Sequence, residues 1–159
     1  MEEKAVVDAS IVVKWFIEEE HSDQALSLRE AFATGRIQLH APALMPYEVL
    51  NALARSALFT GDELVLIARS LSGYGFEIST SVGDGLEKMA VLCAGDELTA
   101  YDAAYVALAQ RLKARLYTAD VELLKGFPDV AIHIEMYGEP GQKAGLMIPA
   151  DLKDPPGLP

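Results

Sequence analysis

The sequence predicts an α/β fold with a parallel sheet covered by helices on both faces. Short apolar segments alternate with stretches of helical patterning along most of the chain, an order typical of parallel sheets. The 159 residues are 51% hydrophobic and 23% charged, which is the composition of a globular chain with a sizeable core. In such folds the functional site lies outside the carboxyl ends of the strands.

The amino-terminal part begins with a strand. Residues 4–8 (Lys-Ala-Val-Val-Asp) form a short apolar run, and a helix that starts at Ser10 continues to about residue 17. A second helical stretch, 22–34, ends where Gly35 follows. Residues 36–40 alternate between polar and apolar side chains, so we expect a second short strand there.

Prolines and a capping pattern delimit the middle of the chain. Two prolines fit the start of a helix that runs from Pro46 to about residue 59 and carries one apolar stripe. Residues 60–63 (Thr-Gly-Asp-Glu) have the spacing of a capping box, which predicts a helix over 61–72. After two glycines, residues 76–79 form a third strand and residues 83–94 a further helix.

The last predicted elements repeat the alternation. Thr99 caps a helix over residues 100–113, and a fourth strand over 114–118 follows at once. A short helix over 121–125 separates it from a fifth strand over 130–134.

The composition also limits the organisation and the environment of the protein. We assign residues 1–137 to one domain and residues 138–159, which are rich in proline and glycine, to an extended tail. No apolar stretch approaches the roughly 18 residues of a membrane span, and no secretory leader precedes the first strand. The single cysteine, Cys93, cannot form an internal disulfide, which fits a cytoplasmic protein.

Charge and histidine content restrict the possible ligands. A formal net charge of −11 is unfavourable for a nucleic-acid-binding protein, which usually has a basic face. Nucleic-acid binding would therefore depend on metal ions and a local basic strip. His21, His40 and His133 are scattered along the chain, and together with one cysteine they form no zinc motif.

Four acidic residues stand where they could converge. Asp8 and Asp120 end two predicted strands, Asp102 lies near the start of a helix, and Glu48 lies inside a largely apolar helix. Carboxylates that meet at one point repel each other unless protons or cations lie between them. Mg²⁺ and Mn²⁺ take such oxygen ligands, and these ions can neutralise a phosphodiester and activate water. The pattern therefore favours a hard-metal site formed by these four residues.

Each acid also has a structural alternative. Asp8 is a candidate helix N-cap, Asp120 could cap the short helix that follows it, and Asp102 could stabilise a helix dipole from the first turn. Glu48 has the weakest alternative, because a solvated glutamate is less expected among apolar neighbours. Spacing alone leaves both interpretations open.

Further polar residues extend the candidate site. Ser10 lies two residues after the first acid and Thr118 two residues before the last, so their hydroxyls could orient these carboxylates. Asn51, three residues after the glutamate, could hydrogen-bond that carboxylate or a backbone group. Arg55 and Lys14 could bind phosphate, and a solvated surface position suits each of them at least as well.

Four segments of the chain resemble the PIN domain family and, within it, the VapC-type toxins of prokaryotic toxin–antitoxin pairs. They are Val7–Ser10, Tyr47–Leu53, Tyr101–Ala109 and Tyr117–Asp120, and the Tyr-Asp-Ala-Ala-Tyr block in the third is the most specific. The resemblance runs in order over about residues 4–135. The tail after residue 138 departs from a minimal PIN domain.

The resemblance implies a three-layer α/β/α sandwich with a central parallel sheet in the order 3-2-1-4-5. It also implies an endoribonuclease that depends on Mg²⁺ or Mn²⁺, acts on RNA, forms homodimers and binds a VapB-type antitoxin. The implied metal ligands and catalytic residues are Asp8, Glu48, Asp102 and Asp120, with supporting hydroxyls at Ser10 and Thr118.

Two other functions remain compatible with parts of the pattern. A receiver-like signalling domain also has clustered acids, but it needs a phosphoacceptor aspartate after the third strand and a lysine after the fifth. Residues 79–80 (Ser-Thr) and 134–136 (Ile-Glu-Met) stand there instead. A PIN-fold protein that binds partners without catalysis is the second alternative, and the presence of all four acids argues against it.

Overall fold

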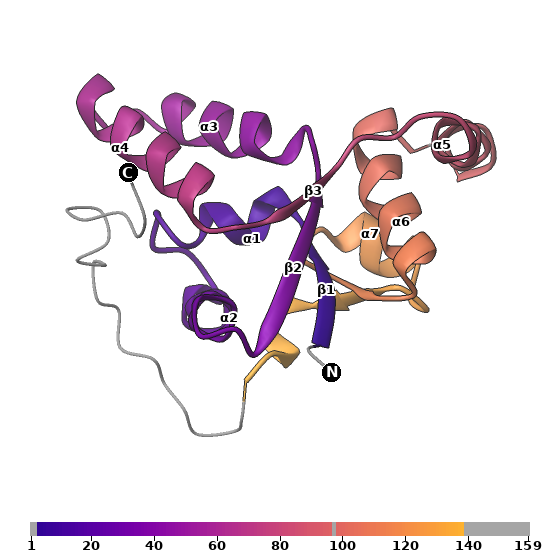
Figure 1. The fold of residues 1–159 in the computed structure, drawn as a ribbon, viewed down its shortest axis with the longest axis horizontal. Coiled ribbons are helices and arrows are strands. Elements are labelled where there is room, and N and C mark those ends of the chain that lie inside the picture. Colours follow the sequence, from indigo (N-terminus) through magenta and orange to yellow (C-terminus); the bar gives the residue numbers. More distant parts are fainter. Residues whose placement is uncertain (1–2, 97, 139–159) are drawn as a thin grey trace.

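Five parallel strands form the centre of the fold in the computed structural model, which describes residues 3–96 and 98–138 (Figure 1). The strands are β1 (Glu3–Val7), β2 (Ile37–Pro42), β3 (Glu77–Ser79), β4 (Arg115–Thr118) and β5 (Ala131–His133). Their order in the sheet is β3-β2-β1-β4-β5, which confirms the predicted order 3-2-1-4-5. A receiver-like fold has the order 2-1-3-4-5, so the strand order excludes that alternative.

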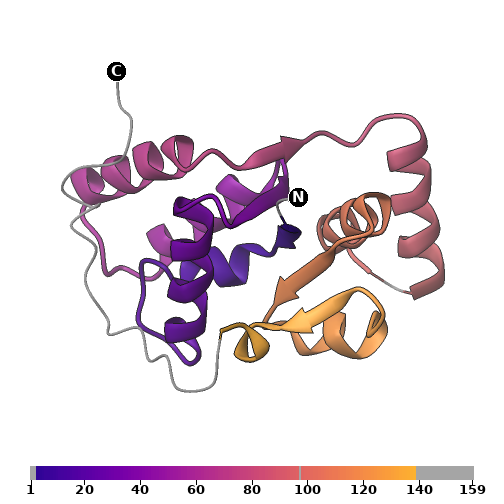
Figure 2. The ribbon, with the colours of Figure 1, turned by 60° about the horizontal axis from the view of Figure 1, so that its bottom comes forward.

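Helices cover both faces of this sheet. They are α1 (Ala9–Val13), α2 (Ser22–Ala33), α3 (Met45–Arg55), α4 (Gly61–Gly73), α5 (Asp84–Asp96), α6 (Ala100–Leu112) and α7 (Val121–Gly126), with a 3₁₀ turn, η1 (Ile134–Met136), after β5. Figures 1 and 2 show α1–α4 on one side of the sheet and α5–α7 on the other. This is the expected result of right-handed crossovers, because the chain moves outward from β1 to β3 and then returns to the other side of β1.

The core lies on both faces of the central strands. Val6, Leu39 and Leu116, from three adjacent strands, are fully buried, and Ile11 and Tyr105 cover them from opposite helical layers. Because β1 is the middle strand, its carboxyl end lies between those of β2 and β4. Among the described residues, no helix combines the length and the apolar character that a membrane crossing requires.

Several element boundaries differ from the sequence predictions. Helix α3 ends at Arg55 instead of near residue 59, because Ala57 takes the left-handed backbone conformation (φ 58°) that a helix cannot continue. Helix α1 is a single short turn that ends at Val13. The predicted tail, 138–159, lies outside the described residues after Gly138.

Candidate metal and catalytic site

The carboxyl ends of β1 and β4 position two of the four acids. Asp8 directly follows β1, and its backbone N–H donates to the Tyr117 carbonyl oxygen at 3.0 Å, which holds the end of β1 against β4. Asp120 lies two residues beyond the end of β4. Strand order reverses between these two strands, so both carboxylates lie at the switch point where α/β proteins bind their ligands.

Two helices contribute the other two acids. Asp102 lies in the first turn of α6, where the Thr99 hydroxyl caps the helix by accepting the Asp102 N–H at 3.1 Å. Glu48 lies in the first turn of α3, and its Oε1 accepts a hydrogen bond of 2.8 Å from the Tyr105 hydroxyl. Tyr105 is on α6, one turn after Asp102, so this bond joins α3 to α6 beside the acids.

Two hydroxyls hold Asp8 in one orientation. The Ser10 and Thr118 hydroxyls both donate to Asp8 Oδ2, each at 2.8 Å. Thr118 Oγ1 also accepts the backbone N–H of Asp120 at 3.0 Å, so one buried hydroxyl connects two of the acids. Among the described residues no hydrogen-bond donor reaches Asp8 Oδ1, which leaves that oxygen available to a cation.

The structure separates the capping alternatives for Asp8 and Asp120. Asp8 stands at the N-cap position of α1, but its side chain makes no capping hydrogen bond, so the capping interpretation is wrong for this residue. Asp120 does cap α7, because its Oδ1 accepts the N–H groups of Glu122 and Leu123 at 2.8 and 3.3 Å. The cap occupies one carboxylate oxygen, which leaves Oδ2 for another ligand.

The pKa values of the acids show that their charges act on one another. Burial raises the pKa of Asp8; the bonds from Thr118 and Ser10 oppose this rise, and repulsion from Asp102 and Asp120 adds to it. Burial also raises the pKa of Glu48. The hydrogen bond from Tyr105 opposes this rise, and repulsion from Asp8 and Asp102 adds to it. The pKa of Asp102 rises through burial and through repulsion from Asp120. Asp8 therefore interacts electrostatically with Asp102 and Asp120, and Glu48 interacts with Asp8 and Asp102.

This donor set fits a hard divalent cation. The four candidate ligands offer only carboxylate oxygens, and Asp8 is just 9% exposed. Within the part of the chain that the structure describes, the charged groups that shift the pKa values of Asp8, Glu48 and Asp102 are all acidic. Mg²⁺ and Mn²⁺ take such oxygen ligands, and either ion would relieve the repulsion.

The other predicted site residues have different surroundings. Asn51 accepts a hydrogen bond of 3.2 Å from Arg55 Nε on the exposed face of α3, and not a bond with Glu48. The Lys14 ammonium is bonded to Glu19 at 3.1 Å, and the residue is only 8% exposed. Binding of phosphate by Lys14 would therefore have to break an existing ion pair, whereas the Arg55 guanidinium is open to solvent.

The sequence prediction missed two sets of residues. Tyr105 was given no role, although its position three residues after Asp102 places both on one face of a helix. The histidines are scattered along the chain, but the rings of His21 and His133 lie 4.8 Å apart in space, centroid to centroid, which the sequence prediction does not anticipate. They meet because η1, which follows β5, packs against α2.

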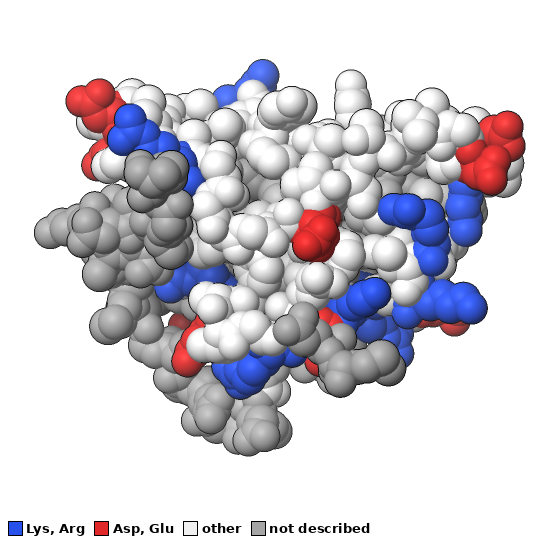
Figure 3. Space-filling view, in the orientation of Figure 1, with Lys and Arg blue, Asp and Glu red and all other residues white. Residues whose placement is uncertain are grey.

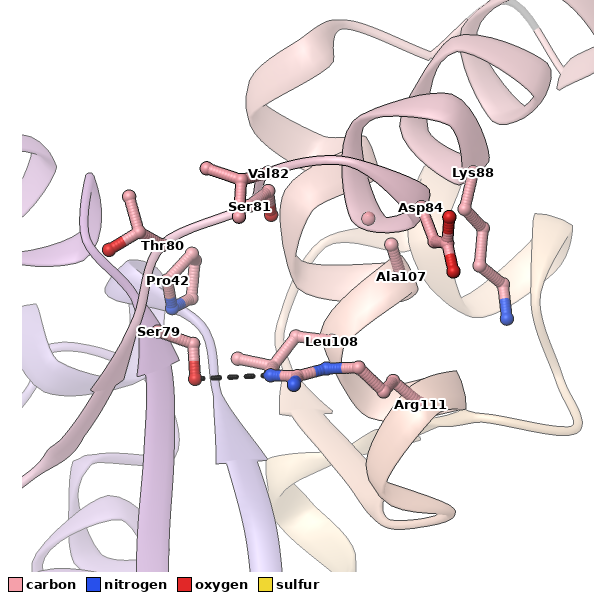
Figure 4. Close-up of a pocket in the computed structure, with 11 residues that line it drawn as sticks. Pro42, Ser79, Thr80, Ser81, Val82, Asp84, Lys88, Ala107, Leu108 and Arg111 are labelled. Atoms are coloured by element: carbon pink, nitrogen blue, oxygen red, sulfur yellow. Dashed lines mark hydrogen bonds between the residues drawn. The ribbon is translucent and has the colours of Figure 1, made fainter.

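A cavity of about 680 Å³ opens away from the acids, between the end of β3, α5 and α6 (Figure 4). Arg111 reaches across it from α6 and donates to the Ser79 hydroxyl at 3.3 Å, while Asp84 and Lys88 face it from α5. None of the four acids lines this cavity. Figure 3 shows Lys and Arg side chains gathered over this part of the surface, which makes it a local basic region on an acidic protein.

Comparisons with known proteins agree with this architecture. The family model described as "PIN domain" matches residues 5–129. Ribonuclease VapC3 of Pyrobaculum aerophilum is 35% identical over 129 residues, which cover 79% of this chain and 95% of that protein.

Two solved structures share the fold. The crystal structure of PAE2754 from Pyrobaculum aerophilum is 25% identical, with a TM-score of 0.60, and the match covers 84% of this chain and 85% of that one. A toxin–antitoxin complex from Klebsiella pneumoniae contains a chain that is 21% identical, with a TM-score of 0.56, matched over 80% of this chain and 96% of its own length.

Proposed function

Because the chain belongs to the PIN domain family, we propose that it is a metal-dependent endoribonuclease and the toxin of a toxin–antitoxin pair. The observation that carries this proposal is that Asp8, Glu48, Asp102 and Asp120 lie near enough for Asp102 and Asp120 to raise the pKa of Asp8, and for Asp8 and Asp102 to raise that of Glu48. The similarity to Ribonuclease VapC3 over most of both chains supports RNA as the substrate.

Asp8, Glu48, Asp102 and Asp120 would hold Mg²⁺ or Mn²⁺. When bound, the cation neutralises the phosphodiester charge and activates a water molecule for attack. The hydroxyls of Ser10 and Thr118 keep Asp8 Oδ2 fixed, so that Oδ1 presents a defined lone pair.

Tyr105 positions the glutamate of the site. Burial, together with the charges of Asp8 and Glu48, raises the pKa of Tyr105 far above its ordinary value, so the phenol stays protonated and donates to Glu48. This bond fixes the Glu48 carboxylate relative to α6, which also carries Asp102.

RNA would approach from the surface that surrounds the acids. Tyr47 and Tyr101, the neighbours in sequence of Glu48 and Asp102, are 73% and 65% exposed. Exposed aromatic rings can stack on unpaired bases without requiring a particular base, which suits single-stranded RNA. The basic region that includes Lys88 and Arg111 would supply the phosphate contacts that the net charge of −11 otherwise disfavours.

Protein partners are the second part of the proposal. Val82, Leu86 and Val91, on and before α5, are apolar side chains with large exposed fractions, a property of surfaces that bind other proteins. We assign this surface to contacts in a homodimer or with a VapB-type antitoxin in the cytoplasm.

The antitoxin could also reach the acid site. A basic antitoxin side chain placed among the four acids would form charge-assisted bonds and compete with the metal. Light scattering of the protein alone and after co-expression with its antitoxin measures both assemblies.

The decisive experiment compares RNA cleavage by the wild type and by Asp102→Asn with Mg²⁺, Mn²⁺ or EDTA. We expect Asp102→Asn to lose at least about a hundredfold in rate, since a charged ligand is removed. Asp62→Asn is the matched control, because Asp62 is an exposed acid in the first turn of α4. Cleavage by the repurified wild type that persists in EDTA would contradict the metal mechanism.

Thermal melting separates a catalytic role of Asp102 from a structural one. The metal-free Asp102→Asn variant should melt no lower than the wild type, because the substitution removes charge repulsion. Clear destabilisation would instead make Asp102 chiefly a structural residue. A protein that binds the metal but cleaves no RNA would favour the non-catalytic alternative.

A further inference from the structure

Two of the three histidines of the chain meet outside the four-acid site. His21 immediately precedes α2, and His133 is the last residue of β5. Their rings form an edge-to-face pair with centroids 4.8 Å apart. His133 is in register with Thr118, the residue that bonds Asp8, so the pair lies one strand away from the acids at the same edge of the sheet.

The Glu135 carboxylate lies near one nitrogen of each ring. Glu135 Oε2 is 3.9 Å from His21 Nε2, and Glu135 Oε1 is 3.7 Å from His133 Nδ1. One candidate ligand atom from each residue lies within 4.8 Å of the other two. Ligands of a tetrahedral zinc ion with bonds of 2.0–2.1 Å stand about 3.3 Å apart. Closure onto a metal thus requires shifts on the order of 1 Å, within the reach of these three side chains.

The ring nitrogen of His133 already presents a lone pair on this side. The backbone N–H of Glu135 donates to His133 Nδ1 at 3.1 Å, so the proton of the neutral ring is on Nε2. A metal ion that binds Nδ1 would replace only one hydrogen bond, the one from the Glu135 N–H on an exposed turn. Among residues 3–96 and 98–138, the charged neighbours of His21 Nε2 are two carboxylates, those of Glu20 at 3.6 Å and of Glu135.

The surroundings favour entry of a cation. The His21 and His133 side chains are 24% and 22% exposed, so the site is accessible from solvent. Glu18, Glu19 and Asp23 line a shallow pocket beside His21 and add negative charge. Imidazole nitrogens combined with one or two carboxylates are ligands for Zn²⁺, Co²⁺ or Ni²⁺ and poor ligands for Mg²⁺.

We propose that His21, His133 and Glu135 form a second metal site, which binds a borderline transition-metal ion such as Zn²⁺, with Glu20 available as a fourth ligand. The ion joins the start of α2 to the end of β5 and η1. It therefore crosslinks segments from opposite ends of the described chain, and it stabilises the folded state by an amount that grows with the logarithm of the free Zn²⁺ concentration above its Kd.

The ring signals of the histidines in an NMR spectrum test this proposal directly. The untagged full chain is saturated with Mg²⁺, which has little affinity for imidazole, and is then titrated with Zn²⁺. With only three histidines in the chain, each set of ring signals can be assigned from a variant. We expect the His21 and His133 signals to shift together with one equivalence point, while the His40 signals stay in place.

The variants are chosen to keep the local backbone. His21→Asn suits the left-handed backbone at this position (φ 64°), and His133→Asn offers an oxygen acceptor to the Glu135 N–H. Either variant should weaken Zn²⁺ binding at least about tenfold. His40→Gln is the matched control: it removes an imidazole that lies on β2 and should leave binding unchanged.

A melting experiment provides the second readout. Zn²⁺ at a hundredfold excess over its Kd should raise the wild-type melting temperature by about 5–10 °C, and should raise it much less in His21→Asn and His133→Asn. Zn²⁺ that binds while all ring signals stay in place has bound at the four acids, which overturns the proposal. A shift of only one ring overturns it as well, and so does a Zn²⁺ affinity of His21→Asn or His133→Asn equal to that of the wild type.

Discussion

Replacing Thr118 by valine tests whether a hydroxyl positions the acid site. The side chain is fully buried, and valine has nearly the same shape, so the substitution removes hydrogen bonds with little change of packing. It abolishes a 2.8 Å bond to Asp8 Oδ2 and a 3.0 Å bond from the Asp120 N–H. A bond to a charged group contributes about 1.5–3 kcal/mol and a neutral one about 0.5–1.5 kcal/mol, which gives about 2–4.5 kcal/mol for the loss of both.

The size of this loss should depend on pH. The Thr118 bond is the strongest of the contacts that lower the pKa of Asp8, so its removal raises that pKa further and favours the protonated acid. The destabilisation in EDTA should therefore be larger at pH 7.5 than at pH 5, where more of the wild-type Asp8 is already neutral. Urea unfolding at the two pH values measures both quantities.

Metal binding supplies the readout that a purely structural role would not change. With one of two orienting hydroxyls removed, the apparent affinity for Mg²⁺ or Mn²⁺ should fall about 10–100-fold. Thr118→Ser keeps the hydroxyl and loses only a methyl group, so it should retain most of the wild-type metal affinity. The reasoning is refuted if Thr118→Val binds metal like the wild type, or if the serine variant is as defective as valine.

Two further predictions concern the same cluster. The metal-free protein should lose stability as pH rises. The pKa values of Asp8, Glu48 and Asp102 in the folded state are raised above their ordinary values of 3.8, 4.5 and 3.8. The stability that these protonated acids contribute is therefore complete below the ordinary pKa values and is lost as pH rises through the raised ones. Chemical unfolding in EDTA across this range should show a steeper decline for the wild type than for Asp102→Asn; equal slopes would contradict it. Tyr105→Phe removes a 2.8 Å bond to Glu48 from a buried position and should cost about 1–3 kcal/mol, measured by unfolding, together with weaker metal binding. A Tyr105→Phe variant with unchanged metal affinity would show that Glu48 needs no such support.

Much of the fold could be predicted because its signals are local. Apolar runs, glycine stops and the Thr60 capping box mark most elements, and the box forms as expected, with bonds of 3.2 and 2.6 Å between Thr60 and Glu63. Acids at the ends of strands were identifiable because parallel strands end at the same edge of a sheet. The strand order itself came only from the resemblance to a family, since no local pattern specifies which strands pair.

What the sequence could not provide are contacts between distant segments. The bond between Tyr105 and Glu48 spans 57 positions, and the one between Thr118 and Asp8 spans 110. No spacing rule predicts such partners. Spacing also misled at Asn51, which was expected to bond Glu48 or a backbone group and instead accepts a hydrogen bond from Arg55 on the same helix. The boundary of α3 depends on the backbone of Ala57, a residue with no sequence preference for the left-handed conformation.

The two clusters at this edge of the sheet differ in the chemistry of their ligands, and that difference determines which ion each would bind. The four acids offer only oxygen, and the charges of Asp102 and Asp120 disfavour a second charge at Asp8, so small, hard dications are the natural partners. The cluster of His21, His133 and Glu135 offers two nitrogens, which bind zinc far better than magnesium. Because His133 and Thr118 are paired in register, an ion at one site adds positive charge near the other. Occupation of the histidine site should therefore weaken Mg²⁺ binding at the acids, an effect that screening by salt reduces.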